Sequence, residues 1–339
     1  MMPKIMLRRI LSALLSFSGI HAILEHLRLS DRAFVLMYHR VLSPVGQLPH
    51  YVQPGMFVTA ATFERQLSYL RNKFEITFLD ELVAKARKGE RIGRHCALTF
   101  DDGWGDNYSE AFPLLKKYGV PATIFLTTGF VGTQRTFWPE EIISCLARLD
   151  IGSLTGYQAP QSFIRFAGEI GGVKRADLET LFEGAIELLK KKSPQDREEI
   201  LSHLRGAFNG EPPPRQMLNW EEAREMAQSG LVRFGAHTVN HELLDQLPLQ
   251  MVRDEIYLSR QEIEQRLEQK VTTFAYPNGN HSKAVQQLLV EGGLEAAVTT
   301  RKGFVEHGMS FLEIPRIALH EDVSTTIPML RSKILMQAF

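Results

Sequence analysis

Two short clusters of polar side chains could carry chemistry in this chain. The first is Asp101 and Asp102, which stand between an apolar segment ending at Phe100 and the flexible Gly103. Neighbouring side chains of a strand point to opposite faces, so both carboxylates reach one site only where the chain turns, as Gly103 allows. Two acids this close repel unless a cation lies between them or one is protonated. An ordinary Asp-Gly turn is the alternative interpretation.

The second cluster is His237 and His241, in the sequence HTVNH. Histidines four residues apart lie on one face if the segment turns helically, as two imidazoles binding one metal require. Together with Asp102 they make two imidazoles and one carboxylate, which leaves room for water as in a catalytic metal site. Asp101 is then free to act as a base in metal-assisted hydrolysis. The alternative is a pair of polar loop histidines, since the chain has 11 His.

Both clusters follow short apolar segments that we expect to be buried strands. The expected strands cover residues 34–38, 74–78, 96–100, 122–126, 231–235, 272–276, 296–300 and 314–318, and helices are expected at 79–88, 109–118, 219–230 and 251–270. Strands that alternate with helices indicate a parallel sheet, either a barrel or a doubly wound layer. No GxGxxG or Walker loop follows a strand, which disfavours the nucleotide-binding forms.

The alternation is interrupted once, which suggests the domain organisation. Residues of about 130–218 are mostly helical and charged, and they end in the proline run at 211–215. Without this insert and residues 1–32, the remainder of 33–339 has the size of one compact barrel. We therefore predict a distorted (β/α) TIM-like barrel with a helical insertion and with its chemistry at the C-terminal strand ends.

Residues 1–32 form a predicted amphipathic helix with basic ends. Lys4, Arg8 and Arg9 precede an apolar run over 10–20, which is too short to span a bilayer. Three interpretations stay open: a helix packed on the barrel, peripheral membrane contact through residues 4–28, or an export signal. The cytoplasm or the cytoplasmic membrane face is favoured over export.

The composition excludes several classes of protein. With 39 Lys and Arg against 39 Asp and Glu, the formal net charge is zero, so no nucleic-acid partner is expected. Apolar residues make up 44 % of the chain, which argues against disorder. Two cysteines cannot build a disulfide framework, and Cys96 and Cys145 are expected in the core.

Several motifs resemble those of the polysaccharide deacetylases of the NodB-homology type, carbohydrate esterase family 4. Residues 99–103 (TFDDG) match the first motif of the family, and residues 237–241 match the second, H-[ST]-x-x-H. Residues 38–41 (YHRV) resemble the start of one branch of the family, and 274–279 (FAYPNG) look like a variant third motif. The resemblance covers roughly residues 34–320, apart from the insert.

The resemblance implies the following roles. Asp101 would be the general base, and Asp102, His237 and His241 would bind a divalent metal, most often zinc, with Co, Ni, Fe or Mn as alternatives. The backbone around Asn278, with Tyr276 beside it, would stabilise the oxyanion. A histidine would protonate the leaving amine, and His320 is the nearest match to that motif. His39 is a second candidate for this acid, or else orients Asp101 or is structural.

The third motif departs from the family pattern. Ala275 stands where the family has an Arg that holds the base through a charge-assisted hydrogen bond. Arg316, in the last predicted strand, is the candidate replacement. Trp104 and Trp138 are aromatic residues that either stack on sugar rings or belong to the core.

These features lead to one predicted function and two rivals. We expect a metal-dependent hydrolase that removes N-acetyl groups from an N-acetylated sugar in a polysaccharide or glycoconjugate. The rivals are an amide hydrolase on the same scaffold that acts on a small non-sugar amide, and a catalytically silent glycan-binding relative. Intact Asp101, Asp102, His237 and His241 argue against silence, and Ala275 argues for it.

Overall fold

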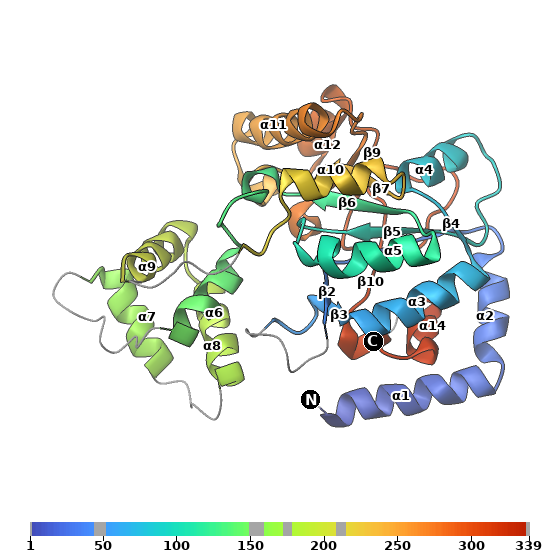
Figure 1. Cartoon of the computed structure of the whole chain (residues 1–339), viewed down its shortest axis with the longest axis horizontal. Coiled ribbons are helices and arrows are strands. Elements are labelled where there is room, and N and C mark those ends of the chain that lie inside the picture. The colour runs from blue at the N-terminus through green and yellow to red at the C-terminus, as the bar shows by residue number, and fades with distance from the viewer. Residues whose placement is uncertain (1, 44–51, 149–158, 172–177, 208–214, 337–339) are drawn as a thin grey trace. The chain divides into compact units, whose positions relative to one another are not determined.

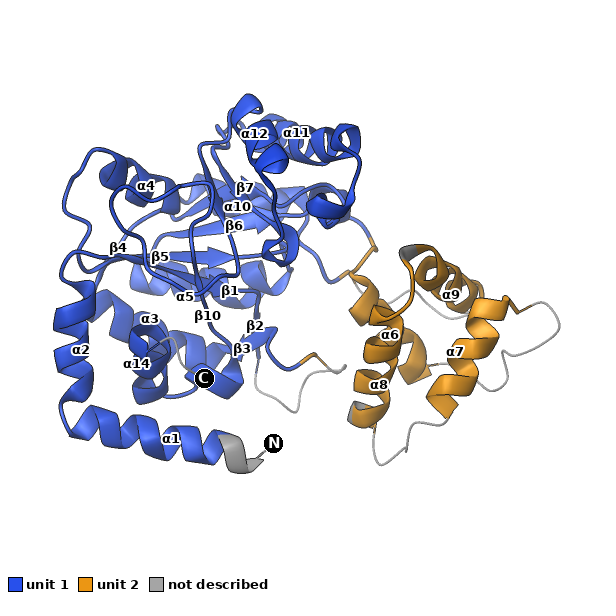
Figure 2. Cartoon of the chain, turned by 180° about the vertical axis from the view of Figure 1, so that it is seen from behind, with its two compact units in different colours: residues 1–47, 54–133, 216–339 blue, residues 48–53, 134–215 orange. Residues whose placement is uncertain are grey.

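A computed structural model describes the chain except for residues 1, 44–51, 149–158, 172–177, 208–214 and 337–339. The chain divides into two compact units (Figure 2). The first unit comprises residues 1–47, 54–133 and 216–339, and the second comprises 48–53 and 134–215. All residues predicted for the site, apart from Trp138, belong to the first unit.

The first unit is built on a parallel sheet of eight strands whose order along the main path is β10-β1-β5-β6-β7-β8-β9, with β4 beside β5 (Figure 1). The strands are β1 (Phe34–Tyr38), β4 (Glu75–Ile76), β5 (His95–Phe100), β6 (Ala122–Leu126), β7 (Val232–Ala236), β8 (Thr273–Ala275), β9 (Ala296–Val298) and β10 (Ile317–Ala318). Two further strands, β2 (Arg40–Leu42) and β3 (Phe57–Thr59), pair with each other.

The helices of the first unit lie outside this sheet (Figure 1). They are α1 (Met2–Phe17), α2 (Ile20–Leu29), α3 (Ala60–Lys73), α4 (Leu79–Arg87), α5 (Phe112–Tyr118), α10 (Trp220–Gln228), α11 (Leu249–Leu267), α12 (Lys283–Glu291), α13 (Glu321–Ser324) and α14 (Ile327–Met336). Because each parallel strand needs a crossover to the next, this order gives the βα alternation that the sequence predicts.

Alternate residues of the strands feed two separate apolar clusters. In β1, Phe34 and Leu36 belong to a large cluster that includes residues of α3, α5, α10 and α11. Val35, between them, belongs to a smaller cluster with Ala97 and Ala275. This two-residue period is the one that a strand buried on both faces requires.

The segment 314–318 reaches both edges of the sheet. Ile314 forms a parallel bridge with Val298 at the end of β9, while Ile317 pairs with Leu36 of β1. Arg316 lies between these two contacts. The sheet is therefore curled into a half-barrel surrounded by helices, which confirms the predicted distorted (β/α) barrel.

The structure differs from the prediction in several elements. The N-terminal helix is two helices, because Gly19 adopts a left-handed φ of 79° between α1 and α2. The expected strand at 314–318 keeps only two residues of regular strand, β10. The sequence analysis also missed β2, β3, α3, α12 and α14, and it set the boundaries of several other elements too wide.

The second unit contains the helices α6 (Trp138–Arg148), α7 (Gln161–Gly171), α8 (Leu178–Lys190) and α9 (Pro194–Ala207). They share one apolar cluster around Phe163, Phe166 and Ile186. The longer segment of this unit, 134–215, falls within the range 130–218 expected for the insert. Most of the proline run at 211–215 lies outside the described residues.

Candidate active site

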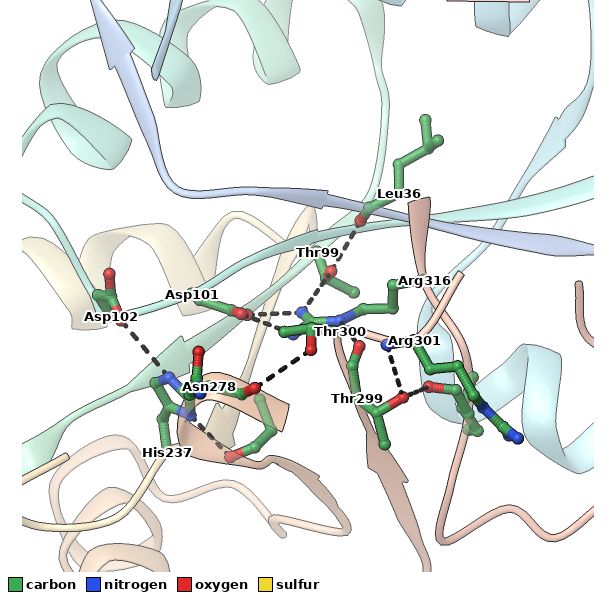
Figure 3. A network of polar contacts seen from close by, with 12 residues as sticks. Leu36, Thr99, Asp101, Asp102, His237, Asn278, Thr299, Thr300, Arg301 and Arg316 are labelled. Carbon is green, nitrogen blue, oxygen red and sulfur yellow. Dashed lines mark hydrogen bonds and ion pairs between the residues drawn. The ribbon is translucent and has the colours of Figure 1, made fainter. Parts of the chain in front are cut away.

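The two neighbouring carboxylates lie at the C-terminal end of β5 and point to different partners (Figure 3). The backbone N–H of Asp101 still donates to Tyr38 O of β1, at 3.0 Å. Asp102 and Gly103 then both adopt a left-handed backbone, with φ of 77° and 82°. The φ of Gly103 favours glycine, and a Cβ atom there would lie 2.7 Å from Leu126 Cδ2, so the end of that side chain would have to shift.

Asp101 forms a bidentate ion pair with Arg316. The guanidinium donates to both carboxylate oxygens, with Nη1–Oδ1 at 2.7 Å and Nη2–Oδ2 at 2.6 Å. Thr299 O and Thr99 Oγ1 accept two further hydrogen bonds from Arg316, which is 1 % exposed. Burial opposes ionisation of Asp101, but the charge and hydrogen bonds of Arg316 outweigh it and lower the pKa of this carboxyl.

Asp102 faces the two histidines of the second cluster. Its Oδ1 lies 3.4 Å from His237 Nε2 and 3.5 Å from His241 Nε2. The three potential ligand atoms all lie within 4.8 Å of one another. Ligands of a tetrahedral zinc ion with bonds of about 2.1 Å stand about 3.4 Å apart, so two of the three separations match such an ion directly.

The surrounding contacts leave the right atoms available to a metal. His237 Nδ1 lies 2.7 Å from Ala275 O, so the carbonyl accepts a hydrogen bond from Nδ1–H, and Nε2 keeps its lone pair for a metal. Trp104 Nε1 donates to Asp102 Oδ2 at 2.9 Å, on the oxygen that does not face the histidines. The donor set of one carboxylate and two imidazoles is one that zinc and similar divalent ions prefer. These residues therefore fit a catalytic metal.

The two imidazoles differ in their proton affinity. Burial lowers the pKa of both, but the hydrogen bond to Asp102 and the charge of Asp101 outweigh burial at His237 and raise its pKa. Burial and the nearby His237 lower the pKa of His241 to about 4. A cation that binds the Nε2 atoms of both histidines therefore competes with a proton mainly at His237.

The histidine segment is a strained loop and not the helical turn that the sequence suggested. Thr238 and His241 have positive φ values of 66° and 59°. The loop is held by Glu255 of α11, whose carboxylate accepts hydrogen bonds from the backbone N–H groups of Val239 and Asn240 at 2.8 Å each. Glu255 was not predicted as a site residue, because it lies in a helix with many charged residues and no motif singles it out.

The structure corrects two of the predicted contacts with substrate. Trp104 is fully buried, with the Arg40 guanidinium 4.3 Å from its ring, so it cannot stack on a sugar and instead holds Asp102. Tyr276 is also buried, and its hydroxyl donates to Leu312 O while its backbone N–H donates to Val298 O. Both donors of Tyr276 are thereby used within the protein and do not serve an oxyanion.

Of the remaining predicted residues, all but Trp138 follow the ends of strands of the first unit. Asn278 is exposed, with a φ of 55°, and its carbonyl accepts a hydrogen bond from Thr300 Oγ1 (Figure 3). His39 follows β1, and its charge contributes to the low pKa of Asp101 and Asp102. His320 precedes α13 with its Nδ1 3.7 Å from Asp322 Oδ2, and burial lowers its pKa. Trp138 lies in the second unit.

At the strand ends of the half-barrel, an Asp–His–His group lies beside a separately paired carboxylate. This arrangement is typical of metal-dependent hydrolases. A family model described as polysaccharide deacetylase matches residues 88–297, which is more than half of the chain. The chain belongs to the polysaccharide deacetylase family and is a hydrolase of that type. The deacetylases of this family are in general metal-dependent.

Two curated relatives are similar to the chain in sequence. A protein named putative polysaccharide deacetylase YxkH, from Bacillus subtilis, is 22 % identical over 86 % of this chain and 72 % of its own length. The poly-beta-1,6-N-acetyl-D-glucosamine N-deacetylase of Staphylococcus aureus is 36 % identical over 31 % of this chain. The chain spans only 39 % of that second relative.

Solved structures share the fold. The Streptococcus pyogenes deacetylase PplD, in complex with acetate, is 20 % identical and covers 90 % of this chain and 97 % of its own, with a TM-score of 0.57. A de-N-acetylase from Aggregatibacter actinomycetemcomitans is 16 % identical and covers 89 % of this chain and all of its own, with a TM-score of 0.58. At these identities the likeness concerns the fold alone.

Replacement of Trp104 by Phe is expected to weaken metal binding about 10- to 100-fold, because Asp102 loses the hydrogen bond that orients it. The affinity is measured by competing a zinc chelator against the purified chain. Trp220→Phe, in α10, is the matched control and should retain the wild-type affinity. Equal affinities in Trp104→Phe and wild type would show that the indole does not position Asp102.

Proposed function

We propose that the chain removes the acetyl group from an N-acetylated sugar in a polysaccharide or glycoconjugate, with zinc held by Asp102, His237 and His241. The observation that carries this proposal is the separate pairing of the two adjacent carboxylates. Asp101 is paired with Arg316, whereas Asp102 faces the two imidazoles. The proposed base and the proposed metal ligand are thus adjacent in sequence but have different partners.

The reaction needs a proton acceptor for water, and we propose Asp101 for this role. Its low pKa keeps it ionised at neutral pH, so it can accept the proton as the water oxygen attacks the acetamide carbonyl carbon. A divalent cation in this site would supply Lewis-acid polarisation of the carbonyl and a lower pKa for a nearby water. Arg316 holds both oxygens of Asp101 and thereby fixes the direction in which the base points.

The C–N bond then breaks, and acetate and the free amine leave. The amine nitrogen needs a proton from an acid, and we propose His320 for this role, with His39 as the second candidate. Burial favours neutral His320, so a proton that it receives is readily given up. Backbone N–H groups around Asn278 would stabilise the oxyanion, without the Tyr276 contribution.

The partners of the chain follow from the same reasoning. An N-acetylated glycan is the proposed substrate, in keeping with the name of the staphylococcal relative. The rival amide hydrolase would use the same residues on a smaller amide. Membrane contact through residues 4–28 stays a prediction, and the exposure of apolar side chains in α1 and α2 supports it.

Asp101→Asn should lower acetate release from N-acetylglucosamine oligomers about 100-fold or more, because the amide cannot accept a proton, while bound zinc is retained. Acetate and metal content are measured on the same preparation, with Asp106→Asn as a control for loss of a buried carboxylate outside the metal group. No bound metal together with unaltered turnover in Asp101→Asn would defeat the enzyme proposal. Hydrolysis of a small amide without acetate release would favour the rival hydrolase.

Arg316→Ala should move the acidic limb of the kcat/KM profile to higher pH by about one unit or more. The sign follows from the pairing: without the guanidinium, burial raises the pKa of Asp101, so ionisation of the base requires a higher pH. Arg316→Lys keeps a positive charge and should shift the acidic limb less than Arg316→Ala does. This comparison separates the loss of the charge from a loss of folding. Arg301→Ala, an exposed neighbour, is the control, and an unchanged profile in Arg316→Ala would remove Arg316 from the account.

A further inference from the structure

The N-terminal helices expose an unusual amount of apolar surface. Of the 15 large apolar side chains that are exposed among the described residues, nine lie in α1 and α2. These nine are Met6, Leu7, Ile10, Leu11, Leu14, Phe17, Ile20, Ile23 and Leu27. Phe17, at the junction of the helices, is 90 % exposed, and the least exposed of the nine is still 41 % exposed. Patches of this kind mark interaction surfaces.

The inward face of the same helices makes polar contacts with α14, beside the buried Leu29 and the partly buried Leu24 of α2. Ser16 and Glu25 both accept hydrogen bonds from Arg331 of α14, at 2.9 and 2.8 Å. His21 Nε2 lies 2.9 Å from Ser332 Oγ, also on α14, and Arg28 donates to the backbone oxygen of Leu335. Specific polar contacts on the inner face therefore fix the rotation of both helices.

An ordinary surface helix turns its apolar stripe toward the core, whereas α1 turns its apolar stripe outward. In α1 the exposed apolar residues recur at the spacing of one helical face, from Met6 and Ile10 to Leu14 and Phe17. Ser12, on the opposite face, is buried. None of the nine exposed side chains belongs to the apolar clusters of the first unit, and the contacts with α14 hold this face outward.

Charge and shape both fit a lipid surface. Residues 1–32 contain five Lys and Arg against two acidic residues, whereas the rest of the chain has three more acidic than basic residues. Among the described residues, no single helix is long and apolar enough to cross a membrane. The segments Ile5–Phe17 and Ile20–Leu29 qualify only as a pair, and they are bent by 80°. Two short, bent, amphipathic helices with basic residues suit the plane of a bilayer surface.

We propose that α1 and α2 lie flat on an anionic bilayer, with their nine exposed apolar side chains in the interfacial layer and Phe17 at the bend inserted most fully. This proposal deepens the predicted membrane contact and is independent of the chemistry at the strand ends. Apolar burial supplies the binding energy, and the basic residues add attraction to anionic lipid headgroups. The membrane would then hold the first unit by its N-terminal helices and α14.

The test uses the full chain and sedimentation with large vesicles, either of phosphatidylcholine alone or with about a third phosphatidylglycerol. The test variant carries Leu14→Asp, Phe17→Asp and Leu27→Asp. The matched control carries Leu249→Asp, Met251→Asp and Leu258→Asp, three similarly exposed apolar residues of α11. Wild type should bind anionic vesicles, the test variant should lose at least tenfold in partitioning, and the control should stay within twofold.

Three outcomes would overturn the proposal. The first is failure of the wild type to bind anionic vesicles, and the second is equal binding by the wild type and the test variant. The third is a dimer in solution that the test variant abolishes, since a second copy would then be the occupant. Acetate release from soluble oligomers should be the same in all three proteins, so that a failed membrane proposal is distinguished from a failed enzyme proposal. Thermal unfolding checks that both triple variants fold.

Discussion

The bidentate pairing of Arg316 with Asp101 is the interaction on which the account of the site depends. Two adjacent carboxylates at the end of β5 would otherwise compete for the same cation. With Arg316 on one of them, Asp101 stays ionised and directed, and Asp102 is left for the two imidazoles (Figure 3). The left-handed backbone at Asp102 and Gly103 makes this separation possible over one residue.

The position of Arg316 explains how the chain manages without an arginine in its third motif. Ala275 is buried at the end of β8, and its carbonyl orients His237. The guanidinium comes instead from the segment that joins the edges of the half-barrel, between Ile314 and Ile317. Closure of the barrel and orientation of the base thus depend on the same five residues, 314–318. Loss of Arg316 would leave a buried carboxylate without its partner, which is costly for stability as well as for catalysis.

Sequence reasoning predicted the elements that carry strong periodic or β-branched patterns. The strands 34–38 and 122–126 were predicted with the bounds that the structure has, because each is a short run rich in apolar and β-branched residues that ends before a polar residue. The helix α3 was missed, since its sequence AATFERQLSYLRNK is mostly polar and buries only a few side chains, such as Phe63 and Leu67. The break between α1 and α2 depends on Gly19, which lies within an otherwise uninterrupted apolar pattern.

The candidate site was predictable in its residues more than in its contacts. Asp102, His237 and His241 follow from motif and spacing, and the structure brings them together. The roles of Trp104 and Glu255 were not predictable, because their contacts depend on left-handed turns at Asp102 and Thr238, and a β-branched Thr rarely adopts this conformation. Trp104 was a candidate for sugar stacking for the same reason: its neighbours in sequence do not reveal its burial.

The adjacent carboxylates have different tasks in this site, and zinc titration of two amide variants separates these tasks. Zinc affinity is measured calorimetrically for wild type, Asp102→Asn and Asp101→Asn. The account predicts that Asp102→Asn loses at least about tenfold in affinity, whereas Asp101→Asn binds zinc within about threefold of wild type. Wild-type affinity in Asp102→Asn, or an equal loss in both variants, would contradict it.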